Sequence, residues 1–265
     1  MGGIIWLSEY PGSGIASVRA FLHQLLSGRP ETAYMTLADQ MFFDASDPAW
    51  YKPYLPQALE KTPVPYLAKL RLKVQEDMER RQKTPVFITT RSCVGAIHGS
   101  DYHHGALSAG AICIVRNPLD LVASTSVAHS LPPETVWRNL ANTDAQRPVG
   151  PDQLPEYYGS WSTHVASWTD RKDKFLLTLK YEDLVSRPQA EYRRLIKFLK
   201  VKPERQRFLK AVAQGKPSLT QDTPASSAQD LPLWREVLTD EQVSLVVDSH
   251  RAQMKRFNYI PKGFE

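Results

Sequence analysis

The sequence has few cysteines, no long apolar run and no metal-binding spacing. Only Cys93 and Cys113 occur among 265 residues, and they are not spaced as CxxC, which argues against a zinc site or a disulfide framework and fits a reducing cytosol. No run of about 18 apolar residues is present, so we expect no membrane-spanning helix and no membrane partner. The start Met1-Gly2-Gly3 carries no basic stretch, so we expect no signal peptide and a cytoplasmic location.

Repeats and low-complexity tracts are also missing, and the composition is that of a globular chain. Hydrophobic residues make up 42% and charged residues 23%, which excludes collagen-like, disordered and coiled-coil classes. The length suffices for a sizeable core, and we expect one domain over residues 1–265. The formal net charge is +5, which is compatible with an anionic ligand, a nucleic acid or an ordinary basic surface. No basic run with interleaved aromatics supports nucleic acid, and nothing indicates an oligomeric state.

The order of elements alternates between strands and helices. Apolar runs predict strands at 4–7, 85–90, 110–115 and 175–180, and apolar positions at helical spacing predict helices between them. This order predicts an α/β fold with a central parallel sheet flanked by helices, whose ligands lie beyond the carboxyl ends of the strands. We expect helices at 15–26, 67–82, 117–130, 159–169 and 188–199 and from Thr239 onward, and irregular chain at 49–65, 144–155 and 214–233.

The turn after the first strand is a candidate phosphate site. Its glycines let the backbone approach a ligand, and the following helix begins with free N–H groups that favour an anion. It is not a Walker A loop, because no Lys follows the glycines. From local chemistry alone, a phosphate loop and a tight turn without a ligand both remain open. The candidate residues are Pro11, Gly12, Ser13, Gly14, Ile15, Ala16 and Ser17.

A second candidate is Arg116, which follows an apolar strand and precedes a helix opened by Asn117 and Pro118. An arginine at the end of a buried strand is costly to leave unpaired. It either pairs with a carboxylate such as Asp120 or faces an anionic ligand. Local reasoning leaves both alternatives open.

Five segments together resemble the cytosolic-type sulfotransferases, including bacterial members. Tyr10-Pro11-x-Ser13-Gly14 resembles their loop for the 5′-phosphosulfate of 3′-phosphoadenosine 5′-phosphosulfate (PAPS). Arg116-Asn117-Pro118-x-Asp120, with Ser124 one turn later, resembles their 3′-phosphate motif. The likeness runs from about residue 4 to residue 259. Its other segments are Tyr181-Glu182-Asp183-Leu184 before Pro188, the run 159–168, and the run 234–243.

This resemblance implies a P-loop-containing, sulfotransferase-like fold and a defined chemistry. The family transfers a sulfuryl group from PAPS to a hydroxyl or amine of an acceptor, leaving 3′-phosphoadenosine 5′-phosphate (PAP), and needs no metal. Such transfer demands in-line geometry and stabilisation of the leaving phosphate. We therefore expect PAPS or PAP as cofactor and a small-molecule acceptor as partner. Retained at family positions are Ser13, Gly14, Arg116, Ser124 and Tyr181.

Several family positions are substituted. Gly12 stands where the family's loop has a basic residue. Ala16 and Ser17 stand where the family usually has a hydroxyl residue and an aromatic residue. The family's Lys-Thr-His aligns with Thr89-Thr90-Arg91, and its Arg-Lys-Gly segment falls near residues 226–230, which contain neither Arg nor Lys. Losing a loop cation removes charge stabilisation from the transition state, which commonly costs several kcal/mol, about 3 or more.

Arg91 at the family's His position cannot serve as general base, because a guanidinium stays protonated. It can stabilise a leaving phosphate or hold an anionic acceptor. The alternative bases follow the second predicted strand or lie beside the loop. They are His98, His103 and His104, for which a solvent-exposed loop histidine is the favoured interpretation, then Glu9, and His164, which we interpret as structural.

Two functions follow from this pattern. The first is an atypical PAPS-dependent sulfotransferase acting on a small molecule, as in bacterial secondary metabolism. The second is a sulfotransferase-fold protein that has lost transfer and serves another ligand, reaction or partner. The first rests on the full-length resemblance, and the second on the simultaneous loss of the loop cation, the Lys, the His and the basic segment.

Overall fold

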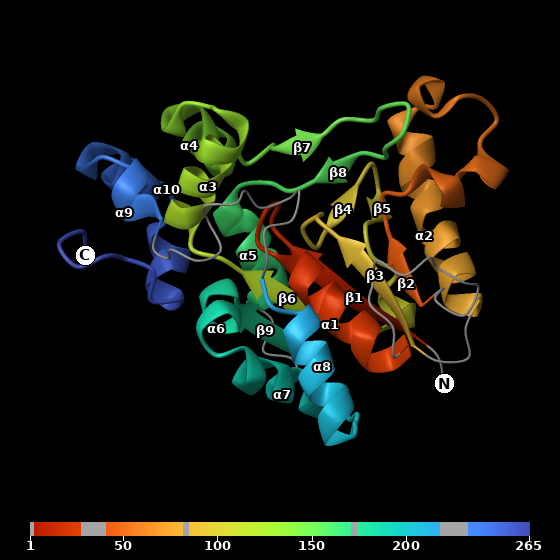
Figure 1. Ribbon diagram of the computed structural model, residues 1–265. Coiled ribbons are helices and arrows are strands. Elements are labelled where there is room, and N and C mark those ends of the chain that lie inside the picture. The colour runs from red at the N-terminus through yellow and green to blue at the C-terminus, as the bar shows by residue number, and fades with distance from the viewer. Residues whose placement is uncertain (1–2, 28–40, 82–84, 171–173, 218–232) are drawn as a thin grey trace.

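A central five-stranded parallel sheet organises the chain (Figure 1). The computed structural model describes residues 3–27, 41–81, 85–170, 174–217 and 233–265. All neighbouring strands of the sheet run parallel. In spatial order they are β2 (Phe42–Asp44), β3 (Val86–Thr90), β1 (Ile4–Glu9), β6 (Ser108–Val115) and β9 (Leu176–Lys180).

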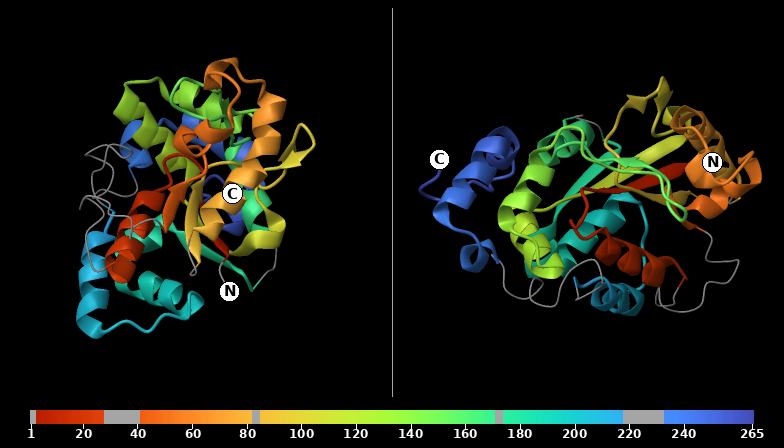
Figure 2. Two further views of the ribbon diagram at one scale, coloured as in Figure 1. Left: turned by 90° about the vertical axis from the view of Figure 1, so that its right-hand side faces the viewer. Right: turned by 90° about the horizontal axis from the view of Figure 1, so that it is seen from above.

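Helices cover both faces of the sheet, as the two views of Figure 2 show. One face packs on α1 (Ile15–Ser27), α7 (Pro188–Phe198) and α8 (Arg205–Gln214). The other packs on α2 (Val64–Arg80), α3 (Pro118–His129), α5 (Trp161–Thr169) and α10 (Asp240–Arg256). The remaining helices are α4 (Pro133–Ala141), α6 (Tyr181–Ser186) and the short α9 (Trp234–Val237).

The sheet is buried on both faces, which explains its nearly continuous apolar strands. In β1, Ile4 and Trp6 join the core under α2, α3, α5 and α10, whereas Ile5 and Leu7 join the core under α1, α7 and α8. All six residues of β1 are buried. Side chains alternate between the two cores because successive residues of a strand point to opposite faces.

The predicted α/β fold with a central parallel sheet is confirmed. The strands predicted at 4–7, 85–90, 110–115 and 175–180 are β1, β3, β6 and β9, and the helices predicted after them are α1, α2, α3, α5, α7 and α10. Strand β2, helices α4, α6, α8 and α9, and two small hairpins were not predicted. The hairpins are β4 (Ala96–Ile97) with β5 (Ser100–Asp101), and β7 (Gln146–Arg147) with β8 (Glu156–Tyr157).

The segments expected to be irregular contain only short regular pieces. Residues 49–65 include three 3₁₀ turns and the start of α2, and residues 144–155 include β7. Most of the segment 214–233 lies outside the described residues. Among the helices that are described, none has both the length and the apolar character needed to cross a bilayer.

Candidate functional site

The loop between β1 and α1 lies at the carboxyl edge of the sheet, where the sequence placed its phosphate loop. Gly12 and Gly14 have φ values of +84° and +98°, a backbone conformation that glycine adopts without steric cost. The amide of Ser13 closes the turn by donating to the Tyr10 carbonyl at 3.0 Å. A Cβ on Gly14 would lie 2.6 Å from the Tyr181 ring. The loop is therefore glycine-dependent both for its turn and for its approach to Tyr181.

Two polar groups of this loop define its chemistry. The Ser13 hydroxyl is fully buried and has no hydrogen-bond partner among the described residues. The amide of Ile15, the first residue of α1, donates to the Glu9 carboxylate at 2.9 Å. A helix N-terminus favours an anion because its first amides lack partners within the helix. Here one of these amides is already satisfied by a carboxylate of the chain itself.

Arg116 follows β6 directly and is 1% exposed. Its Nη1 donates to the Gly12 carbonyl at 3.0 Å, and its guanidinium lies 4.4 Å from the centre of the Tyr181 ring. The Nε and Nη2 atoms are buried without a hydrogen-bond partner in the described parts of the chain. Stacking and one carbonyl do not satisfy a guanidinium, which has five N–H donors. Arg116 therefore presents buried, unused donors beside the loop.

Asp120, one of the two partners considered for Arg116, is engaged elsewhere. Its carboxylate accepts a hydrogen bond from the Trp234 amide at 3.2 Å, and no ion pair joins it to Arg116 in the described structure. Burial raises the Asp120 pKa to about 6, although Trp234 and Arg116 both act to lower it. The alternative in which Arg116 faces an anionic ligand is thus the one that the geometry favours.

The other two retained positions frame Arg116. Tyr181 begins α6 after β9 and is 1% exposed, and burial raises the pKa of its phenol. Ser124 lies in α3, 3% exposed, with its hydroxyl 3.4 Å from the Leu121 carbonyl. The helix itself begins as predicted, because the Asn117 side chain accepts from the Leu119 amide. The backbone amide of Asn117 donates to the Glu182 carboxylate at 2.8 Å. This hydrogen bond connects the starts of α3 and α6.

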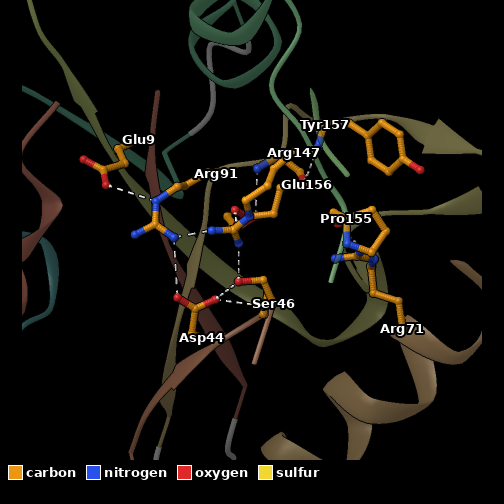
Figure 3. Close-up of polar contacts among 12 residues, drawn as sticks. Glu9, Asp44, Ser46, Arg71, Arg91, Arg147, Pro155, Glu156 and Tyr157 are labelled. Atoms are coloured by element: carbon orange, nitrogen blue, oxygen red, sulfur yellow. Dashed lines mark hydrogen bonds and ion pairs between the residues drawn. The ribbon is translucent and has the colours of Figure 1, made fainter. Parts of the chain in front are cut away.

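Arg91 lies among three carboxylates (Figure 3). Its Nε is 3.6 Å from Glu9, and its Nη1 is 3.5 Å from Asp44 and 3.8 Å from Glu156. The Arg91 side chain is 22% exposed. A guanidinium among carboxylates is held even more firmly in its charged form. Arg91 is therefore a fixed cation at the position where the family resemblance placed a base.

A second arginine completes this cluster. Arg147 forms an ion pair with Glu156 at 2.5 Å and donates to the Ser46 hydroxyl at 2.9 Å, and Ser46 in turn donates to Asp44. Burial raises the Glu156 pKa, and Arg91 and Arg147 oppose that shift. The cluster thus fastens the β7–β8 hairpin to the ends of β2 and β3, as Figure 3 shows.

The predicted histidine candidates have different surroundings. His98 is exposed in the turn of the β4–β5 hairpin, at a φ of +48°. His104 faces Glu76 at 3.2 Å. His164 is fully buried, and burial lowers its pKa to about 3. A group with such a low pKa stays neutral near pH 7 and lies against the Tyr10 ring, 5.7 Å between centres, which suits a packing role.

His103 lines a separate cavity of about 390 Å³. Its ring lies 4.6 Å from Trp6 and 4.8 Å from Trp168, and its Nε2 is 3.2 Å from the Thr90 hydroxyl. The cavity is also lined by the first residues of β6 and β9. The amino ends of parallel strands lie opposite the edge that carries the loop. This cavity is therefore distinct from the site around Arg116.

Some site residues could be found from the sequence and others could not. The loop, Arg116, Ser124, Tyr181 and Arg91 were all singled out. Asp44, Glu156 and Arg147 were not, because no local motif marks them. The segment 226–230, where the family's basic residues were sought, lies outside the described residues. Thr89, at the family's Lys position, is 1% exposed, and its buried hydroxyl has no partner in the described structure.

The fold and the site define a class of α/β proteins with a central parallel sheet and a glycine-containing loop at its carboxyl edge. Residues 5–256 match the family model described as sulfotransferase domain. The match covers most of the chain, and the chain belongs to this family. Family membership makes the protein a transferase of the sulfotransferase class.

Solved structures with the same fold agree with this assignment. A mouse sulfotransferase complexed with PAP superposes with a TM-score of 0.53 at 16% identity, covering 98% of this chain and 90% of that chain. Retinol dehydratase in complex with androsterone and PAP gives 0.56 at 14% identity, covering 95% and 80%. The sulfotransferase domain from the curacin biosynthetic pathway gives 0.54 at 13% identity, covering 98% of each chain. At these identities the likeness concerns the fold.

Proposed function

We propose that the protein binds PAPS at the β1–α1 loop and transfers its sulfuryl group to a hydroxyl or amine of a small-molecule acceptor. The observation that carries this proposal is Arg116, a buried guanidinium with two unused donors beside the loop. Buried donors of this kind are costly unless an acceptor completes them. A phosphate group matches the fork of a guanidinium and can accept two parallel hydrogen bonds from it.

The residues fit the cofactor at its 3′-phosphate end and at its 5′ end, where Glu9 already occupies one amide. Arg116 and Ser124 would hold the 3′-phosphate, with Tyr181 supporting the guanidinium from below. The Ser13 hydroxyl and the first amides of α1 would hold the 5′ end, where Glu9 occupies the Ile15 amide. When bound, PAPS supplies an activated sulfuryl group whose departure leaves negative charge on a phosphate. The Arg91 guanidinium is the cation of the cluster that we assign to stabilise this charge.

The alternative function, a sulfotransferase fold without transfer, has less support. It rests on the simultaneous loss of the loop cation at Gly12, the lysine at Thr89, the histidine at Arg91 and the basic segment near residues 226–230. Arg116 and Ser13 retain unused donors nonetheless, and a fold that had lost its anionic ligand would gain by satisfying them. We further propose a single domain over residues 1–265, a cytoplasmic location and a place in bacterial secondary metabolism. The family match over 5–256 and the fold shared with a domain from the curacin pathway support these proposals.

Calorimetric titration with PAP tests the nucleotide half of the proposal. We expect binding to the wild type and a loss of about 100-fold or more in affinity for Arg116→Ala, because truncating one partner of a buried charged contact commonly costs 2–5 kcal/mol, roughly. The matched control is Arg187→Ala, whose side chain is 61% exposed in an ion pair on α6. The Arg187→Ala variant should bind PAP with the affinity of the wild type. No binding at millimolar PAP would contradict the proposal, and PAP binding without PAPS turnover on any acceptor would favour the alternative.

A further inference from the structure

We propose that Glu9 is a specificity residue of the nucleotide loop, whose carboxylate occupies an anion position at the N-terminus of α1 and competes there with the 5′-phosphate of the nucleotide. This inference rests on the proposed function, because it concerns how tightly the same loop holds PAP. It predicts that the negative charge of Glu9 weakens binding of nucleotides that carry a 5′-phosphate and leaves other nucleotides unaffected.

The first argument is the position of the Glu9 carboxylate. Glu9 is 5% exposed, and its Oε2 accepts from the Ile15 amide at 2.9 Å. Helix α1 has 13 residues, so its first amides carry the positive partial charge that attracts an anion. A phosphate at a helix N-terminus uses these same amides. The carboxylate and a phosphate therefore need the same donor.

The second argument is that the rest of the site has unused donors. The Ser13 hydroxyl and the Nε and Nη2 atoms of Arg116 are buried without partners in the described residues. Polar atoms buried in this way point to a ligand, because native proteins pair nearly all such groups. The Ile15 amide differs from these unused donors, since the Glu9 side chain already accepts its hydrogen bond. The site is therefore prepared for an anion at the Arg116 end and occupied by the protein's own anion at the α1 end.

The third argument is the charge around Glu9. The Arg91 Nε lies 3.6 Å from Oε1 of Glu9, whereas the Ile15 amide donates to Oε2. Arg91 is shared with Asp44 and Glu156, and Glu156 is shared with Arg147. Arg71 also acts on Glu156 and, against the effect of burial, helps to lower its pKa. A phosphate entering beside Glu9 would meet the Glu9 carboxylate at short range, where like charges disfavour one another.

The decisive experiment compares two nucleotides on one substitution. Glu9→Gln keeps an oxygen that can accept from the Ile15 amide but removes the charge. We expect the affinity for PAP, measured by calorimetry, to rise by about 10-fold or more, because the variant removes a negative charge from beside the bound phosphate. Adenosine 3′-monophosphate, which has no 5′-phosphate, should bind both proteins within about 3-fold. The difference between the ligands isolates the 5′ end.

The matched control is Glu191→Gln on α7. Glu191 is also buried, 3% exposed, and paired with an arginine, Arg194, but it lies outside the nucleotide loop. It should leave both affinities unchanged. Glu9→Ser serves as a second variant, since it also removes the charge, and thermal unfolding reports whether each variant is folded. A folded variant of either kind is sufficient for the comparison.

The outcomes separate this inference from the proposed function. PAP binding that is equally tight in the wild type and in both Glu9 variants overturns the competition and leaves the nucleotide site intact. A gain that extends equally to adenosine 3′-monophosphate also overturns it, because the effect would then lie outside the 5′ end. If no protein binds either nucleotide, the proposed function itself fails. Tight PAP binding to the Glu9 variants alone supports both.

Discussion

Tyr181 connects the two halves of the nucleotide site at the scale of single residues. One face of its ring lies under the Arg116 guanidinium, 4.4 Å from the ring centre. Gly14 of the loop approaches the same ring so closely that a Cβ would lie 2.6 Å from it. A cation over an aromatic face gains about 0.5–2 kcal/mol, more when the pair is desolvated. The loop, the ring and the arginine therefore depend on one another.

Gly14→Ala should be strongly disruptive. The residue has a φ of +98°, and its new methyl group would meet the Tyr181 ring. Backbone strain alone costs about 1–3 kcal/mol, and the clash adds to it. We expect a lower free energy of unfolding in urea and weaker PAP binding. Gly99→Ala is the control, because Gly99 has a φ of +75° but nothing within 4 Å of its Cβ. If both variants lose equal stability and both keep PAP affinity, the Tyr181 contact has no role.

The residues of the site differ in how far sequence could reveal them. The loop and Arg116 stand at ends of recognisable strands, so local pattern sufficed. The surroundings of Arg91 depend on β2 and on the β7–β8 hairpin, which lie far from it in sequence. Glu9 was considered only as an alternative base, and the structure pairs it with Arg91 and the Ile15 amide. Such pairings are tertiary, and no spacing rule encodes them.

Helix α10 shows, at the scale of an element, where sequence prediction works best. The helix was predicted from Thr239 onward, and there Thr239 and Gln242 form a capping box in which both reciprocal hydrogen bonds are present. The elements that were missed have weaker signals. Strand β2 has only three residues, and α4 begins among prolines at 132–133. Short elements such as these owe their conformation to packing against neighbours, which a single sequence does not show.

Thr239→Ala should remove half of this capping box. Loss of an N-cap hydroxyl costs about 1 kcal/mol, so the urea midpoint should fall by a corresponding amount. Thr239→Ser is the control, since its hydroxyl can still accept from the Gln242 amide. Equal midpoints for all three proteins would mean that the cap does not limit the stability of α10. Because α10 packs on α3, α4 and α5, its fraying would loosen the side of the molecule that carries Asp120.

Acid should destabilise the molecule as a whole, because two histidines are buried in their neutral form. Burial lowers the pKa of His164 to about 3 and that of His250 to about 4. In the unfolded chain both titrate near 6.5, so between these values the unfolded state binds more protons than the native state. Stability is therefore complete above about pH 6.5 and is lost as the pH falls toward 4.

Urea unfolding at several pH values between 7.5 and 4.5 measures this loss. His250→Gln should flatten the pH dependence by roughly 3 kcal/mol across the full range, at 1.36 kcal/mol per pKa unit. His129 is exposed at the end of α3. The His129→Gln variant should show the same dependence of unfolding free energy on pH as the wild type. Burial raises the Asp120 pKa to about 6, which opposes part of the loss in the wild type. The test is therefore the difference between the wild type and His250→Gln, and a difference that stays constant down to pH 4.5 would contradict a buried neutral His250.

The order of strands in the sheet has a consequence for how the chain acquires its structure. Strand β1 lies between β3 and β6, and β6 lies between β1 and β9, so each central strand waits for partners made much later in the sequence. Pairings between distant segments close long loops and slow the search for the native state. During synthesis, β6 keeps an open edge until residues 176–180 of β9 emerge. The growing polypeptide thus passes through a stage with an apolar, unpaired strand edge, where association with other chains or with a chaperone competes with completion of the sheet.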